Sequence, residues 1–202
     1  VYITAKDIID KYKPNDPVNF LDEFGSRIVE PALNRIFDEY AETTNAYENR
    51  MVMAREAIAD RGIWTAKKRY ILNVHNNEGV QYAEPKIKMM GIEAIKSSTP
   101  QVCREAMKAI FKVIMTGSEE NTQEAIAIFK EHFKTLSPDK IAFPRGVSDI
   151  VKWANDDVIY GKGTPMHVRA ALLHNHHVKK HKLDHEYELI QNGDKIKYIH
   201  LM

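Results

Sequence analysis

The chain has 202 residues, of which 44% are apolar, which is enough for one large domain or two small ones with a hydrophobic core. Its single cysteine, Cys103, excludes a disulfide within the chain and favours a reducing compartment. The net charge is +1, no apolar run approaches the roughly 20 residues that span a bilayer, and the polar start at Val1 is not typical of a signal peptide. We therefore expect a soluble intracellular protein with no membrane partner.

The first sixty residues predict a strand and a long helix. Residues 1–5 alternate and indicate a strand. Asp16 followed by Pro17 is typical of a helix start, because aspartate caps free amide groups and proline fits the first helical position. Pro31 is expected to kink this helix after Glu30. The acidic face of the helix is interpreted as a solvated surface.

Three segments rich in β-forming residues follow, at residues 50–60, 65–75 and 80–93. The turn-forming residues 76–79 (Asn-Asn-Glu-Gly) separate the last two segments. These patterns predict an antiparallel meander.

The second half of the chain predicts mainly helices. Thr99 and Pro100 begin one that Gly117 ends, and Thr164 and Pro165 begin the last one. Two others are expected at residues 121–136 and 148–155. Asn192 and Gly193 are expected to close a hairpin between residues 187–191 and 195–201. The predicted class is α+β, with the boundary between its strand-rich and helical parts near residues 93–96.

Positive charge is concentrated in two segments. Residues 61–100 contain 7 Lys/Arg and 3 Asp/Glu, and residues 161–202 contain 7 and 4, whereas residues 1–60 contain 7 and 12. Because the release of counterions is local to the phosphates that a protein contacts, clustered cations indicate nucleic-acid binding better than net charge does. These two basic segments are the candidate binding surface.

The tetrad of Lys67, Lys68, Arg69 and Tyr70 places three consecutive cations and an aromatic ring at the head of a predicted strand. Alternation along a strand would direct Lys68 and Tyr70 to one face and Lys67 and Arg69 to the other, so that one face could meet a polyanion. The alternative is an ordinary edge strand whose lysines prevent pairing with other chains.

The tetrad belongs to a series of motifs that resembles the family B replicative DNA polymerases of T-even-type bacteriophages. The likeness extends along the chain, is strongest over residues 50–100, and continues more loosely in the last third. The motifs that carry it are residues 54–59 (Ala-Arg-Glu-Ala-Ile-Ala), 64–70 (Trp-Thr-Ala-Lys-Lys-Arg-Tyr), 82–93 (Tyr-Ala-Glu-Pro-Lys-Ile-Lys-Met-Met-Gly-Ile-Glu), 96–100 (Lys-Ser-Ser-Thr-Pro), 165–169 (Pro-Met-His-Val-Arg) and 174–176 (His-Asn-His).

The resemblance implies that residues 1–93 form the C-terminal part of a polymerase palm and residues 94–202 the N-terminal part of the thumb. In the family, an Asp-Thr-Asp-Ser turn holds two catalytic Mg²⁺ ions, and this sequence is absent here. We therefore expect a polymerase fragment that positions primer–template DNA and is not catalytic alone, with Mg²⁺ bound only in the complete enzyme. The implied partners are the remaining part of the polymerase and, through a C-terminal peptide that the chain lacks, a sliding clamp. The implied location is the cytoplasm of the infected bacterium.

The same resemblance assigns roles to residues between positions 56 and 96. Lys68 would reach the minor groove at the primer end, where acceptors are present on every base pair. Lys96 would act similarly, and Lys67, Arg69 and Tyr70 would contact the primer backbone or support the strand. Glu56 would lie near the metal site, although no residue of this chain is expected to be catalytic or to bind a metal.

In the thumb part, His167, Arg169, Asn175 and Lys179 are the expected duplex contacts. A different class of function also fits this stretch, namely a stand-alone nucleic-acid-binding or histidine-rich metal-binding module. Six of the nine histidines lie between residues 167 and 185, and His177 and His181 have a spacing that suits metal ligands. Without a third ligand of clear geometry, the neighbouring lysines favour a track for phosphate.

Overall fold

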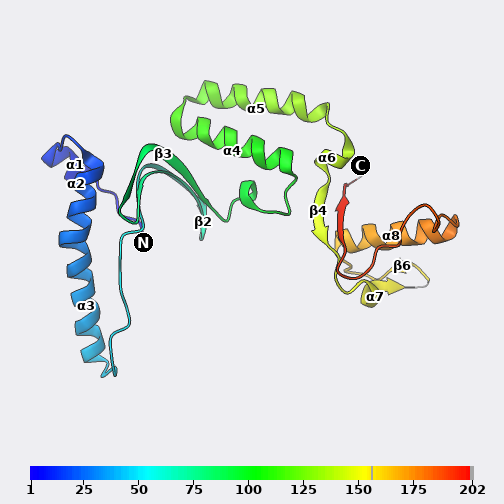
Figure 1. The fold of residues 1–202 in the computed structure, drawn as a ribbon, viewed down its shortest axis with the longest axis horizontal. Helices are drawn as coiled ribbons and strands as arrows, with labels where there is room; N and C mark the ends of the chain where they lie inside the picture. The colour runs from blue at the N-terminus through cyan, green and yellow to red at the C-terminus, as the bar shows by residue number, and fades with distance from the viewer. Residues whose placement is uncertain (156, 201–202) are drawn as a thin grey trace. The chain divides into compact units, whose positions relative to one another are not determined.

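The computed structural model describes residues 1–155 and 157–200. It divides into two compact units, residues 1–90 and 91–202, which are described separately. Helices and antiparallel strands occur in both units (Figure 1), so the predicted α+β class is confirmed. Of the helices in the described part of the chain, none combines the length and the apolar character that crossing a bilayer requires.

The predicted strand at residues 1–5 is wrong. The segment has no regular structure and leads into helix α1 (Lys6–Tyr12), which the sequence did not predict. The three-stranded sheet of the first unit does not include residues 1–5, so their backbone has no ladder to join. Tyr2 instead packs its ring on two aromatic residues of the sheet, Trp64 and Tyr70.

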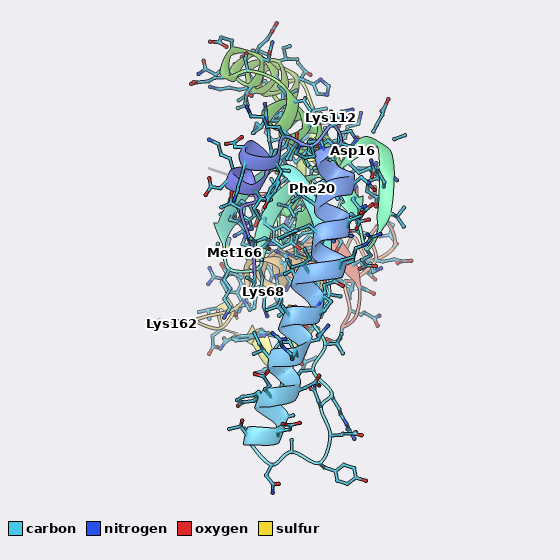
Figure 2. The ribbon with its side chains drawn as sticks, turned by 90° about the vertical axis from the view of Figure 1, so that its left-hand side faces the viewer. Asp16, Phe20, Lys68, Lys112, Lys162 and Met166 are labelled. Atoms are coloured by element: carbon cyan, nitrogen blue, oxygen red, sulfur yellow. The ribbon has the colours of Figure 1, made fainter. Side chains whose placement is uncertain are left out.

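Helix α2 (Pro17–Phe24) begins as predicted. The Asp16 carboxylate accepts hydrogen bonds from the backbone amides of Val18 and Asn19, at 3.1 and 3.0 Å. Helix α2 and the helical residues that follow it form an arm, and Asp16 and Phe20 lie at one end of this helical arm (Figure 2). The arm continues through a π-helical segment (Gly25–Val29) into α3 (Glu30–Thr43). Pro31 is the second residue of α3, separated from the π-helical segment by Glu30. Because proline lacks an amide donor, the irregular hydrogen bonding falls beside it.

The predicted meander is confirmed. Strands β1 (Ala57–Ala66), β2 (Arg69–Asn77) and β3 (Val80–Met90) are antiparallel and lie in that order. Residues 50–56 are not part of β1, which corrects the predicted start of the first strand. Their backbone bonds to helix α3 instead: the Asn34 side chain exchanges two hydrogen bonds with Met53, and Glu30 accepts from the Arg55 amide at 2.7 Å.

The central strand β2 carries most of the core of the first unit. Tyr70, Leu72 and Val74 form a buried cluster on one face, and Ile71 is buried on the other. Asn73 is also buried, and its side chain donates to the Asp60 carboxylate at 2.8 Å, so this polar group is satisfied.

The second unit starts with two paired helices, α4 (Gln101–Thr116) and α5 (Glu119–Lys134), after a short 3₁₀ turn at Glu93–Ile95. Both helices were predicted. Gly117 ends α4 as expected, although Pro100 rather than Thr99 occupies the cap position. Ser118 and Asn121 cap α5 reciprocally, which starts it two residues earlier than predicted.

Helix α8 (Met166–Lys180) begins after Pro165 as predicted and packs against α7 (Ile150–Trp153), β6 (Ile159–Tyr160) and β7 (Lys195–Tyr198). The core contains the buried residues Val147, Ile150, Val168, Ala171 and Leu172. The helix predicted at residues 148–155 is reduced to four residues. The other short elements are α6 (Pro138–Ile141), β4 (Phe143–Gly146) and β5 (Ala154–Asn155).

The predicted hairpin between residues 187–191 and 195–201 is wrong. Strand β7 pairs with β4, which lies about fifty positions earlier in the sequence, and residues 187–191 form no strand. The Asn175 side chain on α8 binds both the amide and the carbonyl of Ile190, at 2.8 Å each, and so takes the groups that a ladder would use. Leu201, at the end of the predicted hairpin, lies outside the described residues.

Candidate nucleic-acid interface

Lys67 and Lys68 form the two-residue turn between β1 and β2, which we call the lysine turn. Ala66 and Arg69 are the last paired residues on either side of it. The predicted division of the tetrad between two strand faces is therefore wrong, because these two lysines lie beyond the end of the ladder. Lys68 (labelled in Figure 2) has a φ of 62° and both lysine side chains are exposed. Neither makes an ion pair within the described part of the chain.

An aromatic cluster lies next to the lysine turn. Trp64 and Tyr70 are cross-strand partners, and the Tyr2 ring lies 4.8 Å from the Trp64 ring and 5.7 Å from the Tyr70 ring. A side-chain carbon at Gly62 would come within 2.5 Å of the Trp64 ring, so glycine leaves the space that the indole occupies. This packing fixes the strand ends from which the turn projects.

The other two members of the tetrad are less accessible than the lysines. Tyr70 is only 9% exposed, and burial is the main cause that raises the pKa of its phenol. Of its two expected roles, this burial suits support of the strand better than contact with DNA. Arg69 begins β2 and is half-buried, on the opposite face of the strand from Tyr70.

Glu56 lies immediately before β1 and is bound to Lys88 on β3. The Lys88 ammonium lies 2.5 Å from the Glu56 carboxylate and 3.0 Å from the Asn77 side-chain oxygen. The hydrogen bond to Glu56 is the main cause that raises the pKa of Lys88. Within residues 1–155 and 157–200, no three His, Cys, Asp or Glu side chains are grouped so that they could hold a metal.

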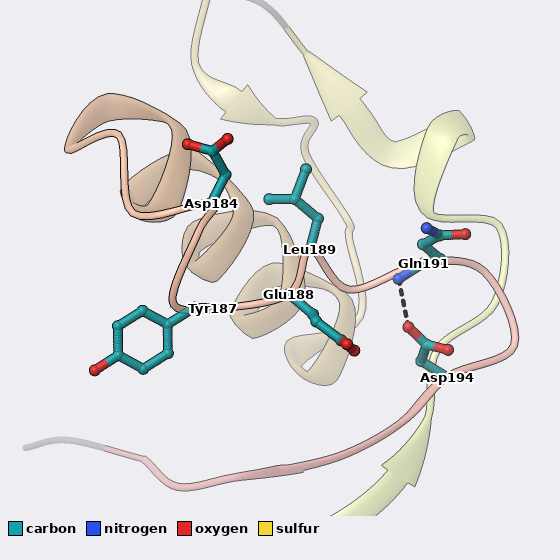
Figure 3. Close-up of a pocket in the computed structure, with 6 residues that line it drawn as sticks. All are labelled: Asp184, Tyr187, Glu188, Leu189, Gln191 and Asp194. Carbon is teal, nitrogen blue, oxygen red and sulfur yellow. Dashed lines mark hydrogen bonds between the residues drawn. The ribbon is translucent and has the colours of Figure 1, made fainter.

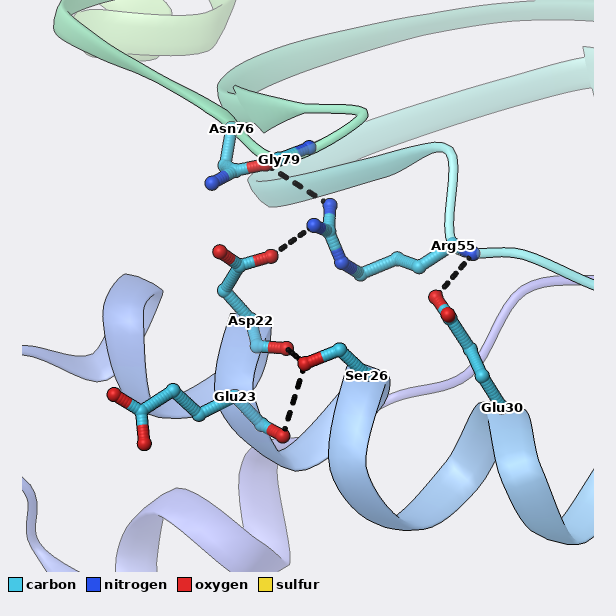
Figure 4. A network of polar contacts seen from close by, with 7 residues as sticks. All are labelled: Asp22, Glu23, Ser26, Glu30, Arg55, Asn76 and Gly79. Carbon is cyan, nitrogen blue, oxygen red and sulfur yellow. Dashed lines mark hydrogen bonds and ion pairs between the residues drawn. The ribbon is translucent and has the colours of Figure 1, made fainter.

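A polar network around Arg55 joins the helical arm to the sheet (Figure 4). The Arg55 guanidinium pairs with Asp22 on α2 and donates to the Asn76 side-chain oxygen on β2 at 3.0 Å. That same oxygen accepts from the Gly79 amide at 3.1 Å. Arg55 belongs to one of the sequence motifs, but its role was not predicted, because its partners lie up to 33 positions away and no local pattern indicates them.

In the second unit, the expected contacts differ in how free their side chains are. Lys96 is exposed but paired with Glu93 at 2.9 Å. Arg169 donates to the Thr164 carbonyl at 2.8 Å and lies over the Tyr160 ring at 5.4 Å. Together with the bonds of Asn175 to Ile190, these contacts show that Arg169 and Asn175 organise the fold around α8.

His167 and Lys179 lie near opposite ends of α8, so the structure does not bring the four expected thumb contacts to one point. Lys179 is exposed in the last turn of the helix. His167 is half-buried, with its ring centroid 6.4 Å from that of Tyr198 on β7.

The ribbon of β4 and β7 carries a group of basic and aromatic residues that the sequence analysis missed. The Tyr198 ring lies 6.0 Å from that of Phe143 and 5.5 Å from that of His200. The exposed cations of the ribbon are Arg145, Lys195 and Lys197. The alternation of residues 195–198 predicted a strand, but with residues 187–191 as its partner instead of β4. The sequence therefore did not indicate that the cations of β4 and β7 lie close together.

An open hollow of about 590 Å³ lies beside the segment that follows α8 (Figure 3). Three carboxylates line it, those of Asp184, Glu188 and Asp194, and the last accepts from the Gln191 amide at 2.6 Å. Because like charges repel, this acidic hollow is unsuited to bind phosphate.

The architecture defines an α+β chain that presents two lysines on a hairpin turn. No family model matches the sequence. It is 38% identical over 195 residues to the DNA-directed DNA polymerase of Escherichia phage RB69, and 34% identical over 188 residues to that of Enterobacteria phage T4. These matches cover 89% and 86% of this chain and 21% of each polymerase. The chain thus spans about a fifth of the length of the T4-type phage DNA polymerases that it matches, and it corresponds in sequence to that part of them.

Proposed function

We propose that the chain is part of a phage DNA-directed DNA polymerase, in which it binds and positions primer–template duplex without being catalytic by itself. The similarity to two phage polymerases supports the first statement. In this proposal residues 1–93 contribute to the family B palm and residues 94–202 to the thumb.

The conformation of Lys68 is the observation that carries the proposal for DNA binding. Its φ of 62° lies in the left-handed region, which costs a residue with a side chain roughly 1–2 kcal/mol. Glycine or asparagine would avoid much of this cost, and strained residues of this kind concentrate at functional sites. The turn places the exposed ammonium of Lys68 beyond the strand ends, where it could reach the minor-groove acceptors that all base pairs present.

The second unit would supply contacts to the duplex backbone. Lys179 and the ribbon cations Arg145 and Lys195 are exposed and can approach phosphate, whereas Lys96 would have to exchange Glu93 for it. Phosphate contacts add affinity without selecting sequence, which suits an enzyme that copies any template. Arg169 and Asn175 would act indirectly by fixing α8, and His167 by packing against the ribbon.

The catalytic metal ions belong, in this proposal, to the complete polymerase. The chain contains no Asp-Thr-Asp-Ser sequence, and Glu56 is bound to Lys88. Two Mg²⁺ ions held by aspartates elsewhere would stabilise the attacking and leaving oxygens of nucleotidyl transfer. The remaining part of the polymerase and a sliding clamp are the further partners that we propose, in the cytoplasm of an infected bacterium.

The purified 202-residue chain tests both parts of the proposal. With Mg²⁺ and nucleotides it should not extend a primer, and extension by the chain alone would contradict the proposal. It should bind duplex weakly and without sequence preference, with a slope of log affinity against log salt of about −0.9 for each phosphate neutralised. Lys179→Ala should reduce the magnitude of that slope by about one unit, as expected for the loss of one phosphate contact. Binding that is independent of salt would exclude a phosphate-based interface.

A further inference from the structure

Two exposed histidines face each other across the last turn of helix α8. The ring centroids of His177 and His181 lie 4.3 Å apart, and both side chains are exposed. The His181 amide donates to the His177 carbonyl at 3.1 Å, so the spacing of one helical turn is maintained up to His181. Apart from this ring contact, neither side chain has a polar partner within the described part of the chain.

The end of the helix is fixed by its own hydrogen bonds, so His181 does not lie on a fraying terminus. Lys182 has a left-handed φ of 57°, and its amide donates to the Lys179 carbonyl at 3.2 Å. The Leu183 amide donates to the carbonyl of Val178, a buried residue, at 2.9 Å. This pattern is a Schellman motif, which holds the last turn of the helix in place. The two imidazoles are thus preorganised before any ligand binds.

We propose that His177 and His181 together chelate one divalent transition-metal ion, with solvent completing its coordination. Imidazole nitrogens bind Zn²⁺ at about 2.0–2.1 Å, and rings one helical turn apart can both reach one ion at that distance. The partial negative charge at the helix C-terminus favours a cation there. For nitrogen ligands the affinity should be highest for Cu²⁺ and lower for Ni²⁺ and Zn²⁺.

The surroundings set the number of ligands at two. His174 is on the same side of α8, but its Nε2 lies 3.1 Å from the Glu188 carbonyl oxygen and is engaged there. The described residues contain no group of three or more potential metal ligands. The cations of Lys180 and Lys182 oppose binding, so affinity should be modest. This site is independent of the proposed binding of DNA.

Calorimetric titration of the untagged chain with Cu²⁺, repeated with Zn²⁺, tests the site. We expect one ion per chain at the tightest site. His177→Ala and His181→Ala should each weaken that site at least about tenfold, which equals about 1.4 kcal/mol. The matched control is His176→Ala, because this exposed histidine neighbours His177 but points about 100° away around the helix, and it should bind as the wild type does.

Electron paramagnetic resonance of the Cu²⁺ complex adds a direct measure of the ligands. Two nitrogen couplings are expected in the wild type and one in either single variant. Circular dichroism checks that the variants keep their helices. Unchanged affinity in both single variants, or an equal loss in His176→Ala, would overturn the proposal.

Discussion

The two turns at opposite ends of strand β2 both connect antiparallel strands, but they differ in sequence and in contacts. Both reverse the chain between antiparallel neighbours, and both contain left-handed residues: Lys68 in the lysine turn, and Glu78 and Gly79 in the turn between β2 and β3, which we call the glycine turn. The glycine turn has glycine at one of its two left-handed positions and Glu78 at the other. The lysine turn has no glycine, and Lys68 occupies its left-handed position.

The two turns also differ in the hydrogen bonds that surround them. The Glu78 amide donates to the Glu56 carbonyl at 2.7 Å, and the Gly79 amide donates to Asn76, which is 1% exposed and bonded to Arg55. The lysine turn has a long side-chain bond across its base, from Thr65 to the Arg69 carbonyl at 3.4 Å, and an aromatic cluster beside it. The glycine turn is therefore held by polar contacts to neighbouring segments, whereas the lysine turn leaves two cations exposed.

Removing the network behind the glycine turn should have the largest effect on stability. Arg55→Ala leaves the Asp22 carboxylate and the Asn76 oxygen without their shared donor. The Arg55 and Asp22 side chains are 18% and 28% exposed, so we expect a loss of about 3 kcal/mol, the low end for breaking a buried pair. Urea unfolding followed by Trp64 fluorescence, in a Trp153→Phe background, measures the loss in the first unit.

The matched control is Arg50→Ala, which removes an exposed pair with Glu48 and should change the free energy of unfolding by no more than about 0.5 kcal/mol. If Arg55→Ala were equally mild, the glycine turn would not depend on this network, and the contrast between the turns would fail.

The lysine turn should respond in function instead. In the complete polymerase, Lys68→Ala should slow extension from a correctly paired primer end by about 1–3 kcal/mol in activation free energy, the range for a charged hydrogen bond. Single-turnover extension from matched and mismatched primers measures this. Lys179→Ala is the comparison, since a phosphate contact should weaken duplex binding without sensing the pair. Wild-type extension of matched ends by Lys68→Ala would show that Lys68 does not contact the primer end.

Lys68→Gly separates the strain of the lysine turn from its charge. Glycine adopts a φ of 62° without steric cost, so the first unit should gain about 1 kcal/mol in the free energy of unfolding, while duplex binding weakens as in Lys68→Ala. Gly79→Ala should do the reverse, because its φ of 83° disfavours a side chain: stability falls and binding is unchanged. Denaturant midpoints and binding titrations of the two variants test these opposite expectations. A gain of stability in Gly79→Ala would contradict them.

The features that the sequence predicted correctly are those with local causes. Asp16 caps α2 through amides two and three residues away, and the residues at positions 76–79 close the β2–β3 turn. The errors arose where distant groups compete for the backbone. Asn175 takes the hydrogen bonds of Ile190, which prevents the predicted hairpin.

The candidate site was predicted in composition but not in geometry. The lysine turn contains neither glycine nor asparagine, so nothing in its sequence separates it from a strand end. Arg55 needs Asp22, Asn76 and the fold between them before its role becomes visible. Sequence thus indicated which cations to consider, and tertiary contacts determine which of them are exposed.

The smallest predicted effect concerns alkaline pH and the Lys88 pair beside the glycine turn. The bond to Glu56 raises the pKa of Lys88 above its ordinary 10.5, and burial raises the pKa of Tyr70 above its ordinary 10.0. Both groups therefore bind their proton more tightly in the folded state than in the unfolded state. Their contribution to the free energy of unfolding is complete below the ordinary pKa values, and it is lost as the pH rises through the raised pKa values. The first unit should lose stability above about pH 10.

Lys88→Met should flatten this decline, and Lys86→Met is its matched control, because the Lys86 ammonium lies over the Tyr82 ring at 4.1 Å rather than on a carboxylate. Urea midpoints between pH 8 and 11, followed by Trp64 fluorescence in the Trp153→Phe background, give the slopes. A flatter slope in Lys88→Met than in Lys86→Met would show that the ion pair with Glu56, which precedes β1 and accepts the Glu78 amide through its backbone, contributes to stability at alkaline pH. Equal slopes in both variants would show that the pair of Lys88 and Glu56 contributes nothing to the loss of stability at alkaline pH.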